Sequence, residues 1–272
     1  MFGFKKLLIT AIWVAIAQTL TAQHHNNAWF RNTLSISLKE KIKTDAEFQH
    51  RRQSGFQNGN MLDNKLMFTF RSWVHYQHNQ NLKFSVSPFA YFSNYRIIQN
   101  KADETAAPNS EVRVSVAEEL QHSIFRHIYL INRNALEYRI IHNQQPNITR
   151  FRTRFGGRYE ITELLKLTVF DEFFINIAGT SAEYIPDHNR IGMNIEYSVL
   201  PNLKFDVGYI YLIRFAVPAA SGNIRLYENN MFLNVTYQLK NDRKKRRQSF
   251  TLCNKSYSTG ETDSLNLQVE NI

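Results

Sequence analysis

The most distinctive stretch of the sequence is Asn147–Glu160, NITRFRTRFGGRYE, in which charged side chains recur at every second position. In an extended chain such residues share one face. They are Arg150, Arg152, Arg154, Arg158 and Glu160. The opposite face is mostly apolar and aromatic. In a membrane β-barrel the apolar face meets lipid and the charged face lines the lumen.

Similar charged positions recur on other segments that alternate in the same way, so we expect one inward-facing charge ladder. Its predicted members are Arg71, Arg113, Glu119, Arg133, Glu137, Arg139, Arg150, Arg152, Arg154, Arg158, Glu160, Glu172, Asn176, Arg190, Glu196 and Arg214. Two functions fit a ladder of mixed sign. Arginines and carboxylates can interlock and fill a narrow lumen, because an unpaired buried charge is costly. Alternatively, an arginine-lined constriction favours anions. For a small barrel we favour the plugged arrangement over conduction.

Nucleophilic catalysis needs a base within hydrogen-bond reach of the nucleophile, and serine and histidine residues are the candidates for these two roles. His122 and Ser123 are adjacent and would point to opposite faces of a strand. His75 falls on the inward row as a hydrogen-bonding residue, and His188 follows Asp187 in an expected loop. The sequence therefore predicts no catalytic residues. An enzyme would need a serine and a histidine on adjacent strands, at one level and pointing the same way.

The sequence predicts neither a metal site nor a cofactor. His24 and His25 are neighbours near the expected cleavage region and do not define a metal site. The chain has one cysteine, Cys253, which excludes a disulfide within the chain and a CxxC motif. No glycine-rich phosphate loop or nucleotide fingerprint is present.

Period-two alternation predicts about eleven strands to position these residues. They are 29–40, 44–52, 64–77, 82–98, 111–121, 128–141, 147–160, 165–177, 190–199, 203–215 and 231–239. Short links such as 200–202 alternate with long ones such as 54–63, 99–110, 178–188 and 216–223, as in outer-membrane barrels. Asp171 falls on the apolar face as an exception, and Pro88 predicts a bulge. Termini on the same side of the membrane require an even number of strands, so we expect ten to twelve.

The composition agrees with a barrel rather than a helical membrane protein. Aromatic residues make up 13% of the chain and charged residues 21%, while the mean hydropathy is −0.41. Residues 1–22 are typical of a secretory signal peptide, with cleavage after Ala17 or Ala22. Residues 28–240 form the predicted barrel. Residues 241–272, which begin with a basic run, are expected to be disordered.

Four segments carry a family resemblance. They contain Glu137 and Arg139, Arg150 and Arg152, Glu172 and Asn176, and Asn189 and Arg190. In this order they resemble a family of bacterial outer-membrane barrels known as domain of unknown function 2490. The resemblance covers roughly residues 28–240 and implies the fold and location but no activity. Asn189 is expected at the rim of the inward row.

Taken together, the sequence predicts an all-β protein: a single antiparallel transmembrane barrel in the outer membrane of a Gram-negative bacterium, exported through a signal peptide. We expect a structural barrel or a narrow passive pore, with a lipid-active hydrolase or acyltransferase as the alternative. The expected partners are outer-membrane lipid and, during insertion, the barrel-assembly machinery. Neither nucleic acid nor a stable protein partner is expected.

Overall fold

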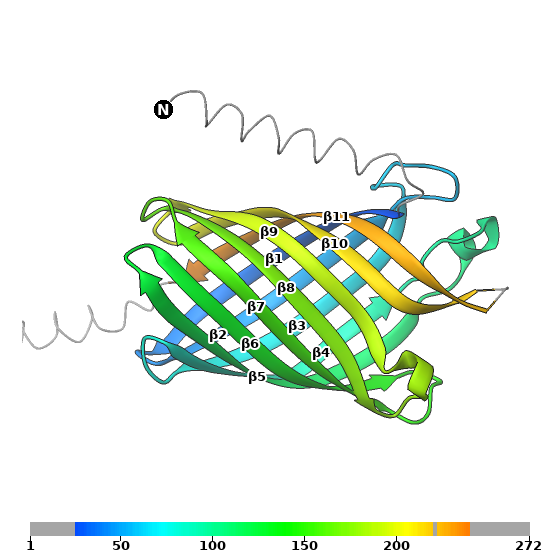
Figure 1. Cartoon of the computed structure of the whole chain (residues 1–272), viewed down its shortest axis with the longest axis horizontal. Coiled ribbons are helices and arrows are strands. Elements are labelled where there is room, and N and C mark those ends of the chain that lie inside the picture. The colour runs from blue at the N-terminus through cyan, green and yellow to red at the C-terminus, as the bar shows by residue number, and fades with distance from the viewer. Residues whose placement is uncertain (1–24, 220–221, 240–272) are drawn as a thin grey trace, which may run out of the picture.

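A computed structural model describes residues 25–219 and 222–239, which form one closed β-barrel with strongly tilted strands (Figure 1). Its strands are β1 (His25–Lys39), β2 (Ile42–Gln53), β3 (Asn64–Gln77), β4 (Leu82–Asn94), β5 (Asn109–Phe125), β6 (Ile128–Ile141), β7 (Ile148–Glu160), β8 (Leu165–Ala178), β9 (Pro186–Leu200), β10 (Leu203–Ala219) and β11 (Gly222–Leu239). Two short 3-10 helices, η1 (Lys101–Thr105) and η2 (Ala182–Tyr184), lie in the loops. The all-β barrel prediction is confirmed. The expected signal peptide and basic tail lie outside the described residues.

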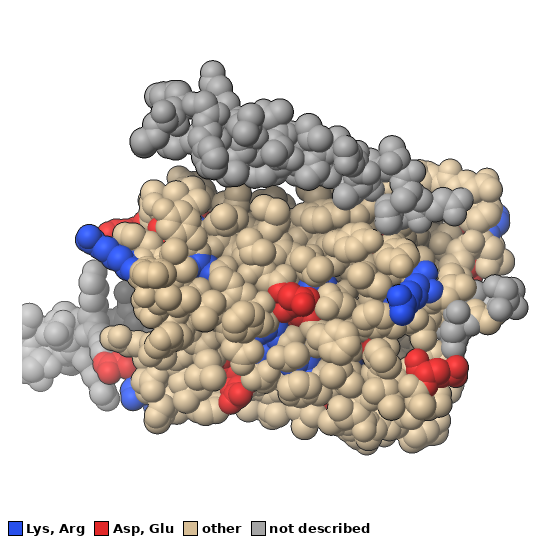
Figure 2. All heavy atoms as spheres, in the orientation of Figure 1, with Lys and Arg blue, Asp and Glu red and all other residues tan. Residues whose placement is uncertain are grey.

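Large apolar side chains point outward along the strands, and polar side chains point inward. Val114, Val116, Ile191 and Ile195 are each more than 40% exposed, whereas Glu137 and Glu172 are at most 2% exposed. The face of the barrel in Figure 2 is mostly uncharged, with a few acidic and basic side chains between its two ends. This inversion matches a lipid environment, where the outer surface must be apolar. Among the described residues, no helix is long and apolar enough to cross a membrane.

Closure of the barrel corrects the expectation of an even strand number. Each consecutive pair of strands is antiparallel, but β1 pairs with β11 in parallel, from His25 beside Glu228 to Ile36 beside Leu239. An odd number of alternating strands can close only through one parallel pair. The even count assumed that both ends of the barrel lie on the same side of the membrane. Instead, β1 starts at the end with the long loops and β11 finishes at the end with the short turns.

Side-chain hydrogen bonds reinforce the parallel seam between β1 and β11, which is useful because parallel pairing is slightly less stable per residue. The Asn27 amide donates to Glu228 at 2.7 Å and to Asn230 at 2.9 Å. Further along, Arg31 donates to Asn234 at 3.1 Å. The seam is therefore held by side chains as well as by its backbone ladder.

Two glycines on the inner face make room for Phe170 of β8. Gly156 of β7 and Gly192 of β9 are the direct neighbours of Phe170 on its two sides. A Cβ atom at Gly192 would lie 2.4 Å from Phe170 Cζ, and one at Gly156 would lie 2.9 Å from Phe170 Cβ. Phe170 packs with Trp29, Ile210 and Leu212 into a buried apolar cluster. This cluster occupies part of the barrel interior, so the lumen is narrower than the backbone suggests.

The structure confirms one local feature predicted from the sequence and corrects two others. The pairing of β4 with β3 and β5 shifts around Pro88, which confirms the expected bulge. His188 belongs to β9 rather than to a loop, because β9 begins at Pro186. The long link expected at 216–223 is largely strand, since β10 continues to Ala219 and β11 begins at Gly222.

The two loops 54–63 and 95–108 meet at one mouth of the barrel. Asn100 caps η1 and accepts hydrogen bonds from Ala102 and Asp103. The Glu104 carboxylate accepts from the backbone N–H of Phe56 at 2.9 Å and pairs with Lys101 at 2.8 Å. The hydrogen bond from Lys101, with that from Phe56, holds the pKa of Glu104 below its usual value. These contacts join the loops without covering the lumen with an element of secondary structure.

Candidate charged lumen

The main cavity has a volume of about 610 Å³ and runs through the barrel interior. Near the long loops it is lined by Tyr95, Ile97 and Gln144, and towards the short turns by Arg158 and Lys166. A second cavity, of about 260 Å³, opens beside the short β9–β10 turn. The two cavities share five lining residues, namely Arg31, Glu47, Glu196, Asp206 and Asn234. They therefore adjoin along the barrel axis.

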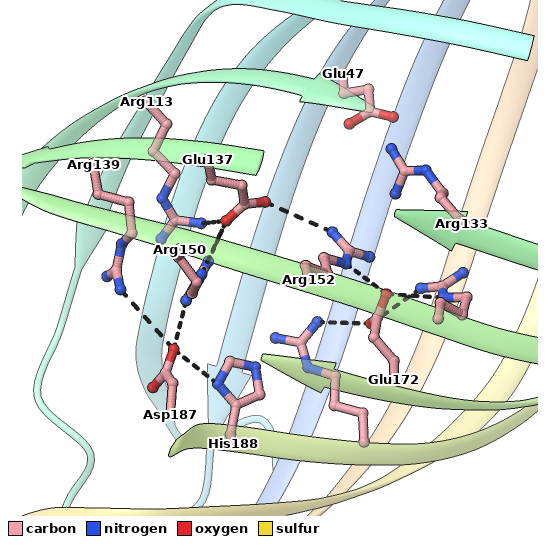
Figure 3. Close-up of polar contacts among 12 residues, drawn as sticks. Glu47, Arg113, Arg133, Glu137, Arg139, Arg150, Arg152, Glu172, Asp187 and His188 are labelled. Carbon is pink, nitrogen blue, oxygen red and sulfur yellow. Dashed lines mark hydrogen bonds and ion pairs between the residues drawn. The ribbon is translucent and has the colours of Figure 1, made fainter. Parts of the chain in front are cut away.

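Alternating arginines and carboxylates link β5, β6, β7 and β9 near the long-loop end (Figure 3). Glu137 accepts from Arg150 Nε at 3.0 Å and from Arg150 Nη2 at 2.5 Å. Arg150 also donates to Asp187 at 2.7 Å. Glu111 accepts two hydrogen bonds from Arg139, at 2.7 and 3.1 Å, and also pairs with Arg113. Each carboxylate thus faces at least one guanidinium fork, the geometry that arginine serves best.

The centre of the network is Glu172, which is fully buried behind a group of arginines (Figure 3). Its carboxylate accepts from Arg152 Nε at 2.5 Å and from Arg154 at 2.9 and 3.2 Å. Arg190 Nη1 lies 3.5 Å away. Arg152, Arg154 and Arg190 come from β7 and β9, on the two sides of β8. One carboxylate therefore positions three cationic side chains along the wall of the cavity.

Ion pairs nearer the short turns are simpler and more exposed. Lys83 contacts Glu119 at 2.7 Å, and Lys166 contacts Glu160 at 2.8 Å. Each of these four side chains is between 24% and 31% exposed. Such pairs are hydrated and contribute little to stability.

The lining of the main cavity carries an excess of positive charge. Twelve arginines and one lysine face seven carboxylates, an excess of six. Glu172 and Glu228 are buried in the wall beside this lining, and counting them leaves an excess of four. The network therefore neutralises most of the arginines but not all of them.

Three of the cavity-lining arginines, Arg51, Arg71 and Arg158, have no carboxylate within 4.0 Å among residues 25–219 and 222–239. Arg158 donates to the neutral Gln121 at 3.1 Å. Arg51 stacks on Trp29, with its Cζ atom 3.7 Å from the ring centroid. Arg71 lies 5.2 Å from the ring centroids of both Trp73 and Phe92. Cation–π contacts stabilise these positions but do not neutralise their charge.

The sixteen residues predicted from the sequence fall into two groups. Thirteen line the main cavity: Arg71, Arg113, Glu119, Arg133, Glu137, Arg139, Arg150, Arg152, Arg154, Arg158, Arg190, Glu196 and Arg214. The other three lie beside it. Glu172 is fully buried, Asn176 donates to the carbonyl of Tyr184, and Glu160 pairs with Lys166. Asn189, expected at the rim, is the fourth residue of β9 and lies on the other row from Arg190.

Sequence reasoning missed several charged residues of the network. Glu111 is 1% exposed and Glu228 is fully buried, yet both bind arginines. Asp187 bridges Arg150 and His188, and it was placed in a loop. For Glu111 a signal was available, because it lies two residues from Arg113 on the same strand, whereas Glu228 and Asp187 have no predicted ladder member at that spacing on their strands.

A second polar arrangement lies inside the barrel near the short turns. His75 of β3 is the direct cross-strand partner of Ser85 of β4. Its Nδ1 atom lies 2.8 Å from Ser85 Oγ, and its Nε2 atom lies 3.2 Å from Asp45 Oδ2. A serine and a histidine on adjacent strands, at one level and pointing inward, are the condition set above for an enzyme. Neither Ser85 nor Asp45 was predicted from the sequence, from which no catalytic residues were expected. No group of three His, Cys, Asp or Glu suited to a metal ion occurs in the described part of the chain.

Comparison with known proteins places the chain in a family. The sequence matches the family described as "Protein of unknown function (DUF2490)" over residues 26–221. The protein belongs to the DUF2490 family. The match begins in β1 and extends beyond the end of β10, so it covers nearly the whole barrel of this DUF2490 member. A comparison with curated proteins found no match.

Solved structures similar to this DUF2490 barrel include two porins and another outer membrane protein. The NanC porin aligns with a TM-score of 0.46 and 11% identity, over 79% of this chain and 99% of the porin. OmpT of Vibrio cholerae aligns with a TM-score of 0.35 and 10% identity, over 72% of this chain and 57% of OmpT. The anion-selective porin from Comamonas acidovorans gives 0.33 and 7%, over 70% and 55% of the two chains. At these identities the similarity concerns the fold.

Proposed function

We propose that this barrel is a narrow passive pore of the outer membrane that passes small anions in preference to cations. In this proposal a signal peptide within residues 1–22 directs export. The observation that carries the proposal is the excess of positive charge along the main lumen cavity.

The paired arginines and the uncompensated ones serve different purposes in such a pore. Carboxylates such as Glu137 and Glu172 hold the guanidinium groups against the wall, which keeps the side chains from collapsing across the lumen. The uncompensated positive charge sets the sign of the potential inside the cavity. A lumen of one sign, enclosed by low-dielectric walls, concentrates counter-ions and excludes ions of like charge.

Planar-bilayer recording tests this proposal directly. With a KCl gradient across the membrane, wild-type protein should conduct, and the reversal potential should have the sign of chloride selectivity. Replacing Arg71 and Arg158 by Glu lowers the net charge of the lumen by four units. This equals the positive excess that remains after Glu172 and Glu228 are counted. Neither arginine is within 4.0 Å of a carboxylate in the described residues, so this double variant breaks no ion pair. It should lose most of its anion preference.

The opposite result would identify a plugged barrel. If wild-type protein is silent and Glu137→Ala conducts, the arginine network closes the lumen and the pore proposal is wrong. Cation selectivity in the wild type would contradict the electrostatic argument as well.

The Asp45–His75–Ser85 arrangement favours a second candidate function, ester hydrolysis within the barrel. In that reaction Ser85 Oγ would attack an acyl carbon while the His75 imidazole takes its proton and Asp45 orients the ring. We rank it second because Ser85 is only 4% exposed and neither Ser85 nor His75 lines either of the two lumen cavities described above. The same contacts also serve as a structural link between β2, β3 and β4.

A fluorophosphonate probe separates the hydrolase from the structural link. A hydrolase should be labelled in the wild type, should lose labelling in Ser85→Ala and should cleave a short-chain ester. No labelling of folded wild-type protein would remove this candidate.

A further inference from the structure

Three hydrogen-bond donors around Trp29 are buried in the wall of the lumen and have no acceptor among the residues that the structure describes. They are Trp29 Nε1, Arg51 Nε and Arg190 Nε. Trp29 itself is 4% exposed. A buried donor without an acceptor destabilises the fold, so a natural protein rarely keeps three of them together without a use.

The three donors belong to one constellation. Trp29 and Arg51 are direct cross-strand partners on β1 and β2. Arg190 reaches the same indole from β9, with its Cζ atom 5.4 Å from the ring centroid. All three side chains line the main cavity.

The charge at this position is also incompletely balanced. Within the described part of the chain, the hydrogen bond of Arg51 goes to Gln49 Oε1, at 3.1 Å, and this amide carries no charge. Arg190 shares Glu172, at 3.5 Å, with two other arginines. An anion with several oxygen atoms would supply both the missing charge and the missing acceptors.

We infer that Arg51, Trp29 and Arg190 form a binding site for an oxyanion, meaning a phosphate or carboxylate group. Planar guanidinium forks bind such groups through two parallel hydrogen bonds. The indole N–H adds a third, uncharged hydrogen-bond donor. A halide ion has no separate oxygen atoms with which to use this geometry. The inference rests on the proposed pore, since it places a selective site along the anion path, but the binding measurement below does not depend on conduction.

Binding is measured with inorganic phosphate and, separately, with acetate. In folded full-length protein, Trp29 fluorescence should change as either anion is added, and Trp29→Phe should remove that change. Where the pore conducts, phosphate should reduce the chloride current with the same concentration dependence. The ratio of phosphate to acetate affinity identifies which of the two oxyanions the site prefers.

Arg51→Gln should weaken the affinity for the preferred anion by at least about tenfold, the factor expected for one charge-assisted hydrogen bond. Arg158→Gln is the matched control, because Arg158 lines the same cavity and contacts the neutral Gln121 at 3.1 Å. It removes the same charge and should change the affinity less than about threefold. Arg51→Lys keeps the charge without the planar fork, and it should show an intermediate loss even where Arg51→Gln folds poorly.

Several results would overturn this site. Equal losses in Arg51→Gln and Arg158→Gln would mean that anions respond only to the overall charge of the lumen. Absence of any fluorescence change in the wild type would mean that water alone satisfies the donors. If the wild type is anion-selective but binds neither probe, the pore stands and the oxyanion site falls. If it binds phosphate but does not conduct, the site stands and the pore falls.

Discussion

Replacing Glu172 by Gln should destabilise the folded barrel by about 3 kcal/mol. Glutamine keeps the shape and one acceptor oxygen but removes the charge that faces Arg152, Arg154 and Arg190. Removing one partner of a buried ion pair typically costs about 3–5 kcal/mol. Arg154 is 32% exposed and can be hydrated, whereas Arg152 and Arg190 are only 14% and 13% exposed. The lower end of the range is therefore expected.

Guanidinium titration of the barrel in lipid vesicles, followed by tryptophan fluorescence and by gel mobility of unheated samples, measures this loss. Glu160→Gln is the matched control, since Glu160 is 24% exposed and pairs with the similarly exposed Lys166. It should cost about 1 kcal/mol or less. If both variants lose less than about 1 kcal/mol, the lumen is wet throughout, and burial does not couple the arginines to Glu172.

Three further substitutions test other parts of the structure by the same unfolding measurement. Gly192→Ala should cost about 1–3 kcal/mol because its Cβ would press on the Phe170 ring, whereas Gly157→Ala, which has open space around it, should be nearly neutral; equal effects would contradict the packing account. Asp171→Leu should stabilise the barrel by about 1 kcal/mol, since Asp171 is exposed on the lipid-facing row of β8, and a loss would show that this carboxylate has a partner in the membrane. Glu228→Gln should cost about 3 kcal/mol, because Glu228 is fully buried and binds an arginine and an asparagine beside the seam, and a neutral result would remove its role there.

The strands were predictable because lipid imposes a strict alternation on them. β3 and β6 have the predicted bounds, and the outward position of Asp171 was recognised as an exception to the pattern. β2 was the weakest prediction, since its outward row includes His50 and Arg52 in place of apolar residues. Its inward residues, including Arg51, were consequently left out of the predicted ladder.

The partners within the network were not predictable, because they depend on strand register and barrel stagger. Glu137 and Arg150 are direct cross-strand neighbours, a relation that a hairpin register would have predicted. Glu172, by contrast, also reaches Arg152, which is paired with Phe174. Asp187 was assigned to a loop because the polar residues at the start of β9 resemble a turn. Inside a polar lumen, however, such residues continue the strand.

The parallel pairing of β1 with β11 also determines on which side of the membrane each end of the barrel lies. A chain that crosses a membrane an odd number of times delivers its two ends to different compartments. β1 begins at the mouth with the long loops, and β11 ends at the mouth with the short turns. If the long loops face the surroundings of the cell, a peptide joined ahead of β1 is displayed there, while one joined behind β11 stays within the envelope.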